Sequence, residues 1–155
     1  MGALKHFRRT VAQFNHQVTF KTPMKNLPPL VEAIMSALDP IQAGHVIIDE
    51  VVFEPRGINA LLAKNSITPM KMDNTRYMHD WSLEGAGERE IEVLLSTVFA
   101  DGIDFAFAPT PKRFMIYSDH DEYTTFFSAT KSNLSPIIKT FSLLGFHRED
   151  YQRRF

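Results

Sequence analysis

Residues 114–127 read Phe-Met-Ile-Tyr-Ser-Asp-His-Asp-Glu-Tyr-Thr-Thr-Phe-Phe, and this stretch decides the fold. Two runs of β-forming side chains, residues 114–117 and 123–127, lie on either side of a short charged segment. Aspartates favour turns because their side chains hydrogen-bond to the local backbone. The pattern predicts an antiparallel hairpin, with strands near residues 113–118 and 123–129 joined by residues 119–122.

The segment before this hairpin extends the same sheet. Ile103, Phe105 and Phe107 alternate with smaller or polar side chains, which is the period-two pattern of a half-buried strand. Residues 109–112 then lead directly into the hairpin. Connections this short join antiparallel neighbours, because parallel strands need a long crossover. The C-terminal half therefore predicts a three-stranded meander.

Helices are expected both before and after the meander in the sequence. Apolar residues at helical spacing predict helices over residues 3–15, 27–38, 88–101 and 134–144, and a weaker one over 58–64. Dense β-branched side chains predict a strand over residues 45–53, and alternation suggests another strand or extended segment at 18–20. Residues 65–87 are the least periodic part, and we expect either a functional flap or a hidden strand there.

Together these patterns predict the α+β class, with residues 1–155 forming a single domain. We expect an antiparallel sheet of four or five strands, including the C-terminal three-stranded meander, packed with about four helices that cover one face. The same periodicity predicts one core that contains the following residues: Ile91, Leu95, Val98, Phe105, Phe107, Ile116, Ile137 and Phe141.

Composition excludes several classes of site. The formal net charge is -1, with 17 basic and 18 acidic side chains, so nucleic-acid binding is not favoured, because phosphate neutralisation requires a basic excess. The absence of cysteine excludes disulfides, thiolate zinc sites and cysteine nucleophiles. We find neither an apolar run of membrane-spanning length nor a signal-peptide core, and we expect a soluble, cytoplasmic protein.

The charged turn is the first candidate site, and it consists of Asp119, His120, Asp121, Glu122 and the adjoining Tyr123. These groups could contact a cationic partner, bind a divalent ion or transfer protons. Neighbouring strand residues point to opposite faces, so only some of these side chains can converge. Turn formation alone also accounts for the aspartates. If the turn binds a basic partner, Asp119 and Asp121 should be exposed.

The second candidate is the cluster formed by Arg76, Tyr77, His79 and Trp81. Arginine, tyrosine and tryptophan are enriched where interfaces concentrate their binding energy. The alternative is that Trp81 fills the core beneath an irregular segment while its polar neighbours are solvated.

Catalysis finds little support in the sequence. There is no Gly-x-x-x-x-Gly-Lys-Ser/Thr loop, Gly-x-Gly-x-x-Gly, His-Glu-x-x-His or Gly-x-Ser-x-Gly motif. We therefore assign no catalytic residue, no metal ligand and no cofactor, and we lean against an enzyme.

The leading hypothesis is a non-catalytic protein-binding domain, most concretely an inhibitor or immunity-type protein that masks a basic toxin or enzyme surface. One alternative is a small metal-dependent hydrolase or nuclease that uses the turn at residues 119–121. The other is a homodimeric structural subunit. Phe126 and Phe127 must point to opposite faces of the sheet, so either helices cover both faces or one apolar face packs on another chain.

Overall fold

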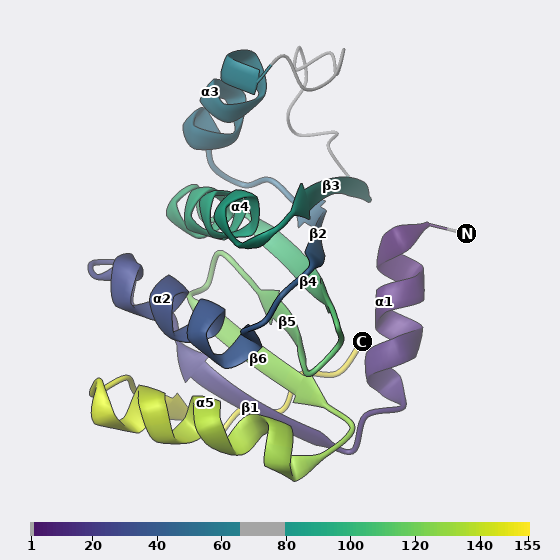
Figure 1. The fold of residues 1–155 in the computed structure, drawn as a ribbon, viewed down its shortest axis with the longest axis vertical. Coiled ribbons are helices and arrows are strands. Elements are labelled where there is room, and N and C mark those ends of the chain that lie inside the picture. Colours follow the sequence, from purple (N-terminus) through teal and green to yellow (C-terminus); the bar gives the residue numbers. More distant parts are fainter. Residues whose placement is uncertain (1, 66–79) are drawn as a thin grey trace.

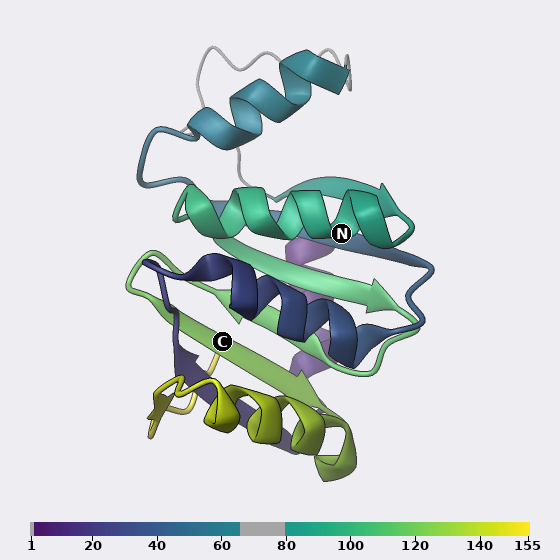
Figure 2. The same ribbon diagram turned by 60° about the vertical axis from the view of Figure 1, so that its left-hand side comes forward.

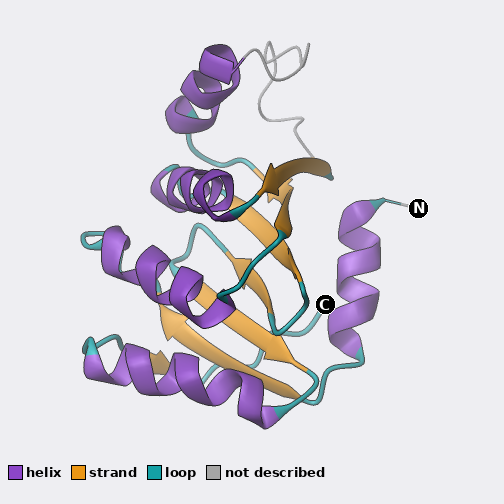
Figure 3. Ribbon diagram, in the orientation of Figure 1, coloured by secondary structure: helices purple, strands orange, loops and turns teal. Residues whose placement is uncertain are grey.

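The computed structural model describes residues 2–65 and 80–155 of the chain. These residues form five helices and seven strands, coloured by type in Figure 3. The helices are α1 (Ala3–Ala12), α2 (Leu27–Leu38), α3 (Arg56–Asn65), α4 (Glu88–Ala100) and α5 (Lys131–Leu143). The strands are β1 (His16–Lys21), β2 (Ala43–Glu50), β3 (Trp81–Ala86), β4 (Asp104–Thr110), β5 (Met115–Ser118), β6 (Tyr123–Ser128) and β7 (Arg148–Glu149).

All seven strands join in one antiparallel sheet with the order β3-β2-β4-β5-β6-β1-β7. The α+β class is confirmed, but the prediction of four or five strands and about four helices was wrong. The prediction missed β7, which has only two residues, too few to show a period. It also left β3 undecided, because the Trp-Ser-Leu-Glu-Gly-Ala sequence contains a glycine and no β-branched side chain.

The predicted meander and its hairpin are confirmed. β4, β5 and β6 are successive neighbours in the sheet, and Ser118 pairs with Thr124 across residues 119–122. β6 pairs next with β1 from the N-terminal half, so the meander lies in the middle of the sheet rather than at its edge.

Helices cover both faces of the sheet rather than the one face of the expected architecture, in agreement with the alternative that the opposed Phe126 and Phe127 left open. Figure 2 shows α2, α4 and α5 side by side on one face, with α1 behind the sheet, while α3 lies beyond α4. α1 and the C-terminal segment share the second face (Figure 1). Phe155 contacts Phe7 of α1 at a ring-centroid distance of 6.1 Å.

The main core lies between the sheet and the three helices α2, α4 and α5. All eight core residues predicted from periodicity are buried in this one cluster, so that prediction is confirmed. A smaller cluster on the second face contains Phe7, Met115, Tyr117 and Phe127. Because Met115 and Phe127 are buried within the chain itself, they do not supply the exposed apolar face on which the homodimer alternative rested.

Among the described residues, no helix combines the length and the apolar character that a membrane crossing requires.

Candidate functional site

One end of the sheet gathers four connecting segments around a hollow. They are the segment after β1, the segment between β2 and α3, the end of α4 with its connection to β4, and the β5–β6 turn. In an antiparallel sheet, alternate connections fall at the same end. The topology therefore brings together segments that are far apart in the sequence, and the charged turn is one of them.

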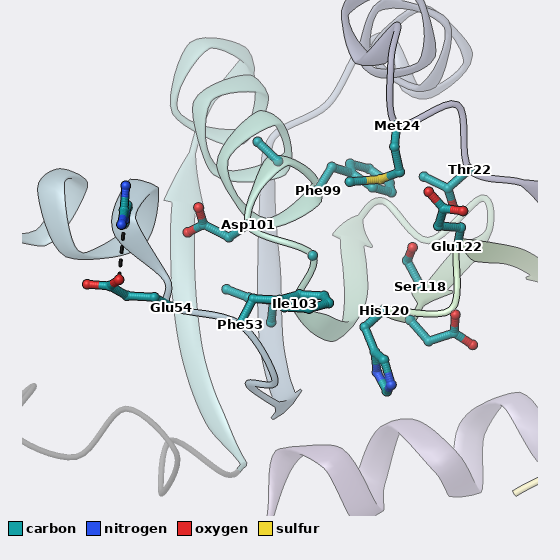
Figure 4. Close-up of a pocket in the computed structure, with 14 residues that line it drawn as sticks. Thr22, Met24, Phe53, Glu54, Phe99, Asp101, Ile103, Ser118, His120 and Glu122 are labelled. Atoms are coloured by element: carbon teal, nitrogen blue, oxygen red, sulfur yellow. Dashed lines mark hydrogen bonds and ion pairs between the residues drawn. The ribbon is translucent and has the colours of Figure 1, made fainter.

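The hollow has a volume of about 410 Å³. Its floor is apolar and includes the buried side chains of Phe99 and Ile103. Phe53 forms part of the wall and is 56% exposed. Figure 4 shows Phe53 in the middle of the group, with Glu54 on one side and Met24 and Glu122 on the other. We call this hollow the Phe53 pocket.

Carboxylates predominate among the charged groups of the Phe53 pocket. The lining contains Glu54, Asp101, Asp119 and Glu122, against one guanidinium and one imidazole, those of Arg56 and His120. Asp101 accepts hydrogen bonds from the backbone N–H groups of Gly57 and Ile58 at 3.0 and 2.8 Å, and so caps the first turn of α3. Glu54 pairs with Arg56 at 3.3 Å, and both side chains are largely exposed to solvent, where such a pair adds little stability.

Backbone hydrogen bonds fix the β5–β6 turn. The N–H of Asp119 donates to the carbonyl of Tyr123 at 3.1 Å, and the N–H of Tyr123 donates to the Asp119 carboxylate at 3.1 Å. Glu122 adopts a positive φ of 69°, which closes the turn. The N–H of Thr22, after β1, donates to the Glu122 carbonyl at 2.7 Å and so ties the turn to a second connecting segment.

Asp119 is not exposed, contrary to the expectation for a binding turn. Its side chain is only 13% exposed and lies 2.6 Å from Nη2 of Arg153, which is itself 9% exposed. The Arg153 guanidinium also stacks over Tyr117, with its Cζ 4.5 Å from the ring centroid. The sequence pattern could not show this because Arg153 lies 34 residues from its partner.

His120 is oriented by Asp104 at the start of β4. Oδ1 of Asp104 accepts hydrogen bonds from the backbone N–H and from Nδ1 of His120, at 2.7 and 2.8 Å. The side-chain bond to Asp104 raises the pKa of His120, and burial raises the pKa of Asp104 although the bonds from His120 oppose that shift. The imidazole Nε2 lies 3.8 Å from Oδ1 of Asp121.

Asp121 and Glu122 present the accessible negative charge of the turn. The Asp121 side chain is 73% exposed. Glu122 is partly exposed, and its Oε2 lies 3.2 Å from Nζ of Lys21. Tyr123 stacks on Tyr151 at a centroid distance of 5.2 Å, so this tyrosine supports the turn from the C-terminal segment.

The second predicted cluster is only partly visible. Arg76, Tyr77 and His79 lie outside the described residues. Trp81 begins β3 and is partly buried against the main core. It starts at the same end of the sheet as the Phe53 pocket but is not one of the residues lining it.

The side chains of the predicted turn do not converge on a metal position. Asp119 faces Arg153, and His120 is bonded to Asp104. Within the described ranges, no three histidine, aspartate or glutamate side chains are grouped so that they could hold a metal ion. The geometry around this turn gives the metal-dependent alternative no support.

Sequence reasoning missed the groups that complete the site, above all Phe53, Asp104 and Arg153. Phe53 was placed at the end of a strand, whereas β2 ends at Glu50 and leaves Phe53 in a connection. Asp104 was recognised only as a polar residue in a strand of alternating pattern. The available signal for Asp104 was an acidic residue at the start of a strand next to the turn that carries His120, and it required the strand pairing to be known.

No protein-family model, characterised protein or solved structure matches the chain. Function is therefore argued from the residues and their geometry.

Proposed function

We propose that this protein is a non-catalytic binding protein that recognises a basic surface on another protein through the end of the sheet that carries the Phe53 pocket. The supporting observation is that an exposed phenylalanine lies beside the accessible carboxylates of Glu54 and Glu122 at the mouth of a formed hollow. Aromatic anchors supply binding energy, and complementary charge accelerates encounter and supports specificity.

The rigidity of the turn favours the same function. Asp119 is used internally, with Arg153 and with the Tyr123 backbone, while Asp121 and Glu122 remain at the surface. A surface that is ordered before binding loses less conformational entropy when the partner arrives. Most concretely, we propose an inhibitor or immunity-type protein that masks a basic toxin or enzyme surface. A cytoplasmic location fits the absence of cysteine.

The test compares wild-type protein with the double variant Asp121→Asn/Glu122→Gln as baits in the native host. We expect a protein with a basic surface to be enriched on the wild type and depleted on the double variant. With that partner purified, the association rate constant should fall roughly tenfold between low and high salt for the wild type, and much less for the variant.

A matched control is Glu88→Gln/Glu92→Gln, which removes two carboxylates from α4, away from the pocket. This control should capture the partner as the wild type does. Equal capture by the wild type and the turn variant, or an association rate that does not respond to salt, would contradict the proposal.

A further inference from the structure

A carboxylate of the β5–β6 turn and an aromatic ring of β5 already hold one guanidinium inside the protein, and the same guanidinium also donates to the Thr125 hydroxyl at 3.3 Å and lies over the Tyr151 ring. On the side of the sheet that faces α1, the carboxylate of Asp119 binds Arg153, and the Tyr117 ring lies under the same guanidinium. A carboxylate gives directed, charge-assisted hydrogen bonds, and an aromatic face attracts the cation. This internal contact shows the chemistry that the turn uses to hold an arginine.

The Phe53 pocket offers the same two kinds of group to a partner. Phe53 supplies an accessible aromatic ring, and Glu122 supplies a carboxylate on the other side of the hollow (Figure 4). The Phe53 ring packs on Gly102, where an added Cβ would lie 3.0 Å from Cδ2 of the ring. The ring therefore lies against Gly102 on one side, and its centroid is 6.4 Å from that of the His120 ring.

Resting on the proposed function, we propose that the Phe53 pocket receives the side chain of an arginine from the partner protein. Such a side chain has an apolar stem and a charged tip. The stem matches the apolar floor at Phe99 and Ile103, and the guanidinium matches the carboxylates at the mouth.

Arginine fits this pocket better than lysine. A planar guanidinium can stack on the Phe53 ring and present a fork of N–H donors to a carboxylate at the same time. A lysine ammonium is a compact, strongly hydrated charge that gains less from an aromatic surface. Lys21 already occupies one oxygen of Glu122, so a donor with several N–H groups is better able to share that carboxylate.

The experiment is an NMR titration of the full ¹⁵N-labelled chain with N-acetyl-arginine amide at one fixed pH. We expect saturable shifts at the amides of Gly102, Ile103 and Glu122. N-acetyl-citrulline amide has the same shape without the charge and should leave these amides unshifted. N-acetyl-lysine amide should bind at least about threefold more weakly than the arginine compound.

Three variants complete the test. Phe53→Ala should weaken arginine binding about fivefold, and Phe53→Tyr should keep it within about twofold of the wild type. Leu143→Ala, at an 81% exposed position on α5, is the matched control and should bind as the wild type does. Because Phe53 is exposed, its replacement should leave the amide spectrum of the core unchanged.

The outcomes separate this inference from the proposed function. Shifts that do not saturate, an equal response to citrulline, equal binding of lysine, or an unchanged Phe53→Ala variant would each overturn the arginine assignment. Capture of a basic partner that depends on Asp121 and Glu122 but not on Phe53 would overturn the pocket inference alone. If N-acetyl-arginine amide binds saturably but no captured protein depends on Asp121 and Glu122, the proposed function alone is overturned.

Discussion

Asp119 and Asp121 are neighbours in one turn, yet they have opposite tasks. Asp119 holds the buried Arg153 guanidinium, while Asp121 lies in solvent. Asp119→Asn leaves a poorly exposed positive charge without its counter-ion, so we expect the free energy of unfolding to fall by about 1–3 kcal/mol. Asp121→Asn should change it by less than about 0.5 kcal/mol. Urea unfolding of both variants measures the difference, and equal values for the two would contradict the assignment.

The His120–Asp104 pair makes stability depend on pH. The pKa of His120 is raised in the folded state from its ordinary value of 6.5, so the protonated imidazole is favoured by folding. This contribution is fully present below about pH 6.5 and is lost as the pH rises through the folded-state pKa. The raised pKa of Asp104 also makes the free energy of unfolding decrease as the pH rises. This second decrease begins near the ordinary aspartate pKa of 3.8.

We therefore expect the free energy of unfolding of the wild type to decrease between pH 6 and pH 9, and His120→Gln to flatten this decrease. Urea titrations at several pH values provide the measurement. His147→Gln, at an exposed position after α5, is the matched control and should retain the wild-type slope. A wild-type slope that survives in His120→Gln would show that another group is responsible.

At the scale of elements, β3 packs tightly on α4. A Cβ added at Gly85 would lie 2.9 Å from Cγ1 of Ile91 and 3.2 Å from the Ile91 backbone nitrogen. The backbone of α4 cannot move aside easily, so Gly85→Ala should lower the free energy of unfolding by about 1–3 kcal/mol. Ala86→Ser, at the next and exposed position, should have almost no effect. Chemical denaturation distinguishes the two, and a neutral Gly85→Ala would show that the contact is looser than described.

Gly85 also illustrates which helices and strands could be predicted from the sequence and which could not. Long apolar periods in α1, α2, α4 and α5, and the alternation in β4, reflect burial on one side and could be recognised without the fold. β3 could not, because its buried positions include a glycine that is selected by contact with α4 rather than by strand propensity. The turn carboxylates could be recognised from the local sequence between two β-forming runs, whereas Phe53 and Arg153 acquire their roles only through tertiary contact.

At the scale of the whole molecule, the C-terminal segment closes the second face of the sheet. Phe155 contacts the rings of Phe7, Tyr117 and Phe127, and Arg153 joins the segment to the turn. Removing residues 151–155 should lower the free energy of unfolding by about 2–3 kcal/mol, or roughly 5–10 °C in Tm at this chain length. It should also increase binding of a dye that detects exposed apolar surface. The full-length variant Arg154→Ala, which alters an exposed residue, should behave as the wild type. Unchanged Tm and dye binding after truncation would contradict this role.

The placement of the Phe53 pocket in connecting segments has an evolutionary consequence. Its lining residues Phe53, Glu54 and Glu122, and the neighbouring exposed Asp121 of the turn, lie outside the buried core clusters, which are built mainly from the strands and helices. Connecting segments tolerate substitution better than the elements they join. Homologues that descend from one ancestral sequence could therefore carry different residues at these four positions and recognise different partners, while the core residues that determine the fold stayed the same. Rapid divergence at this end of the sheet, beside slow change in the core, is the pattern of inheritance that such an architecture permits.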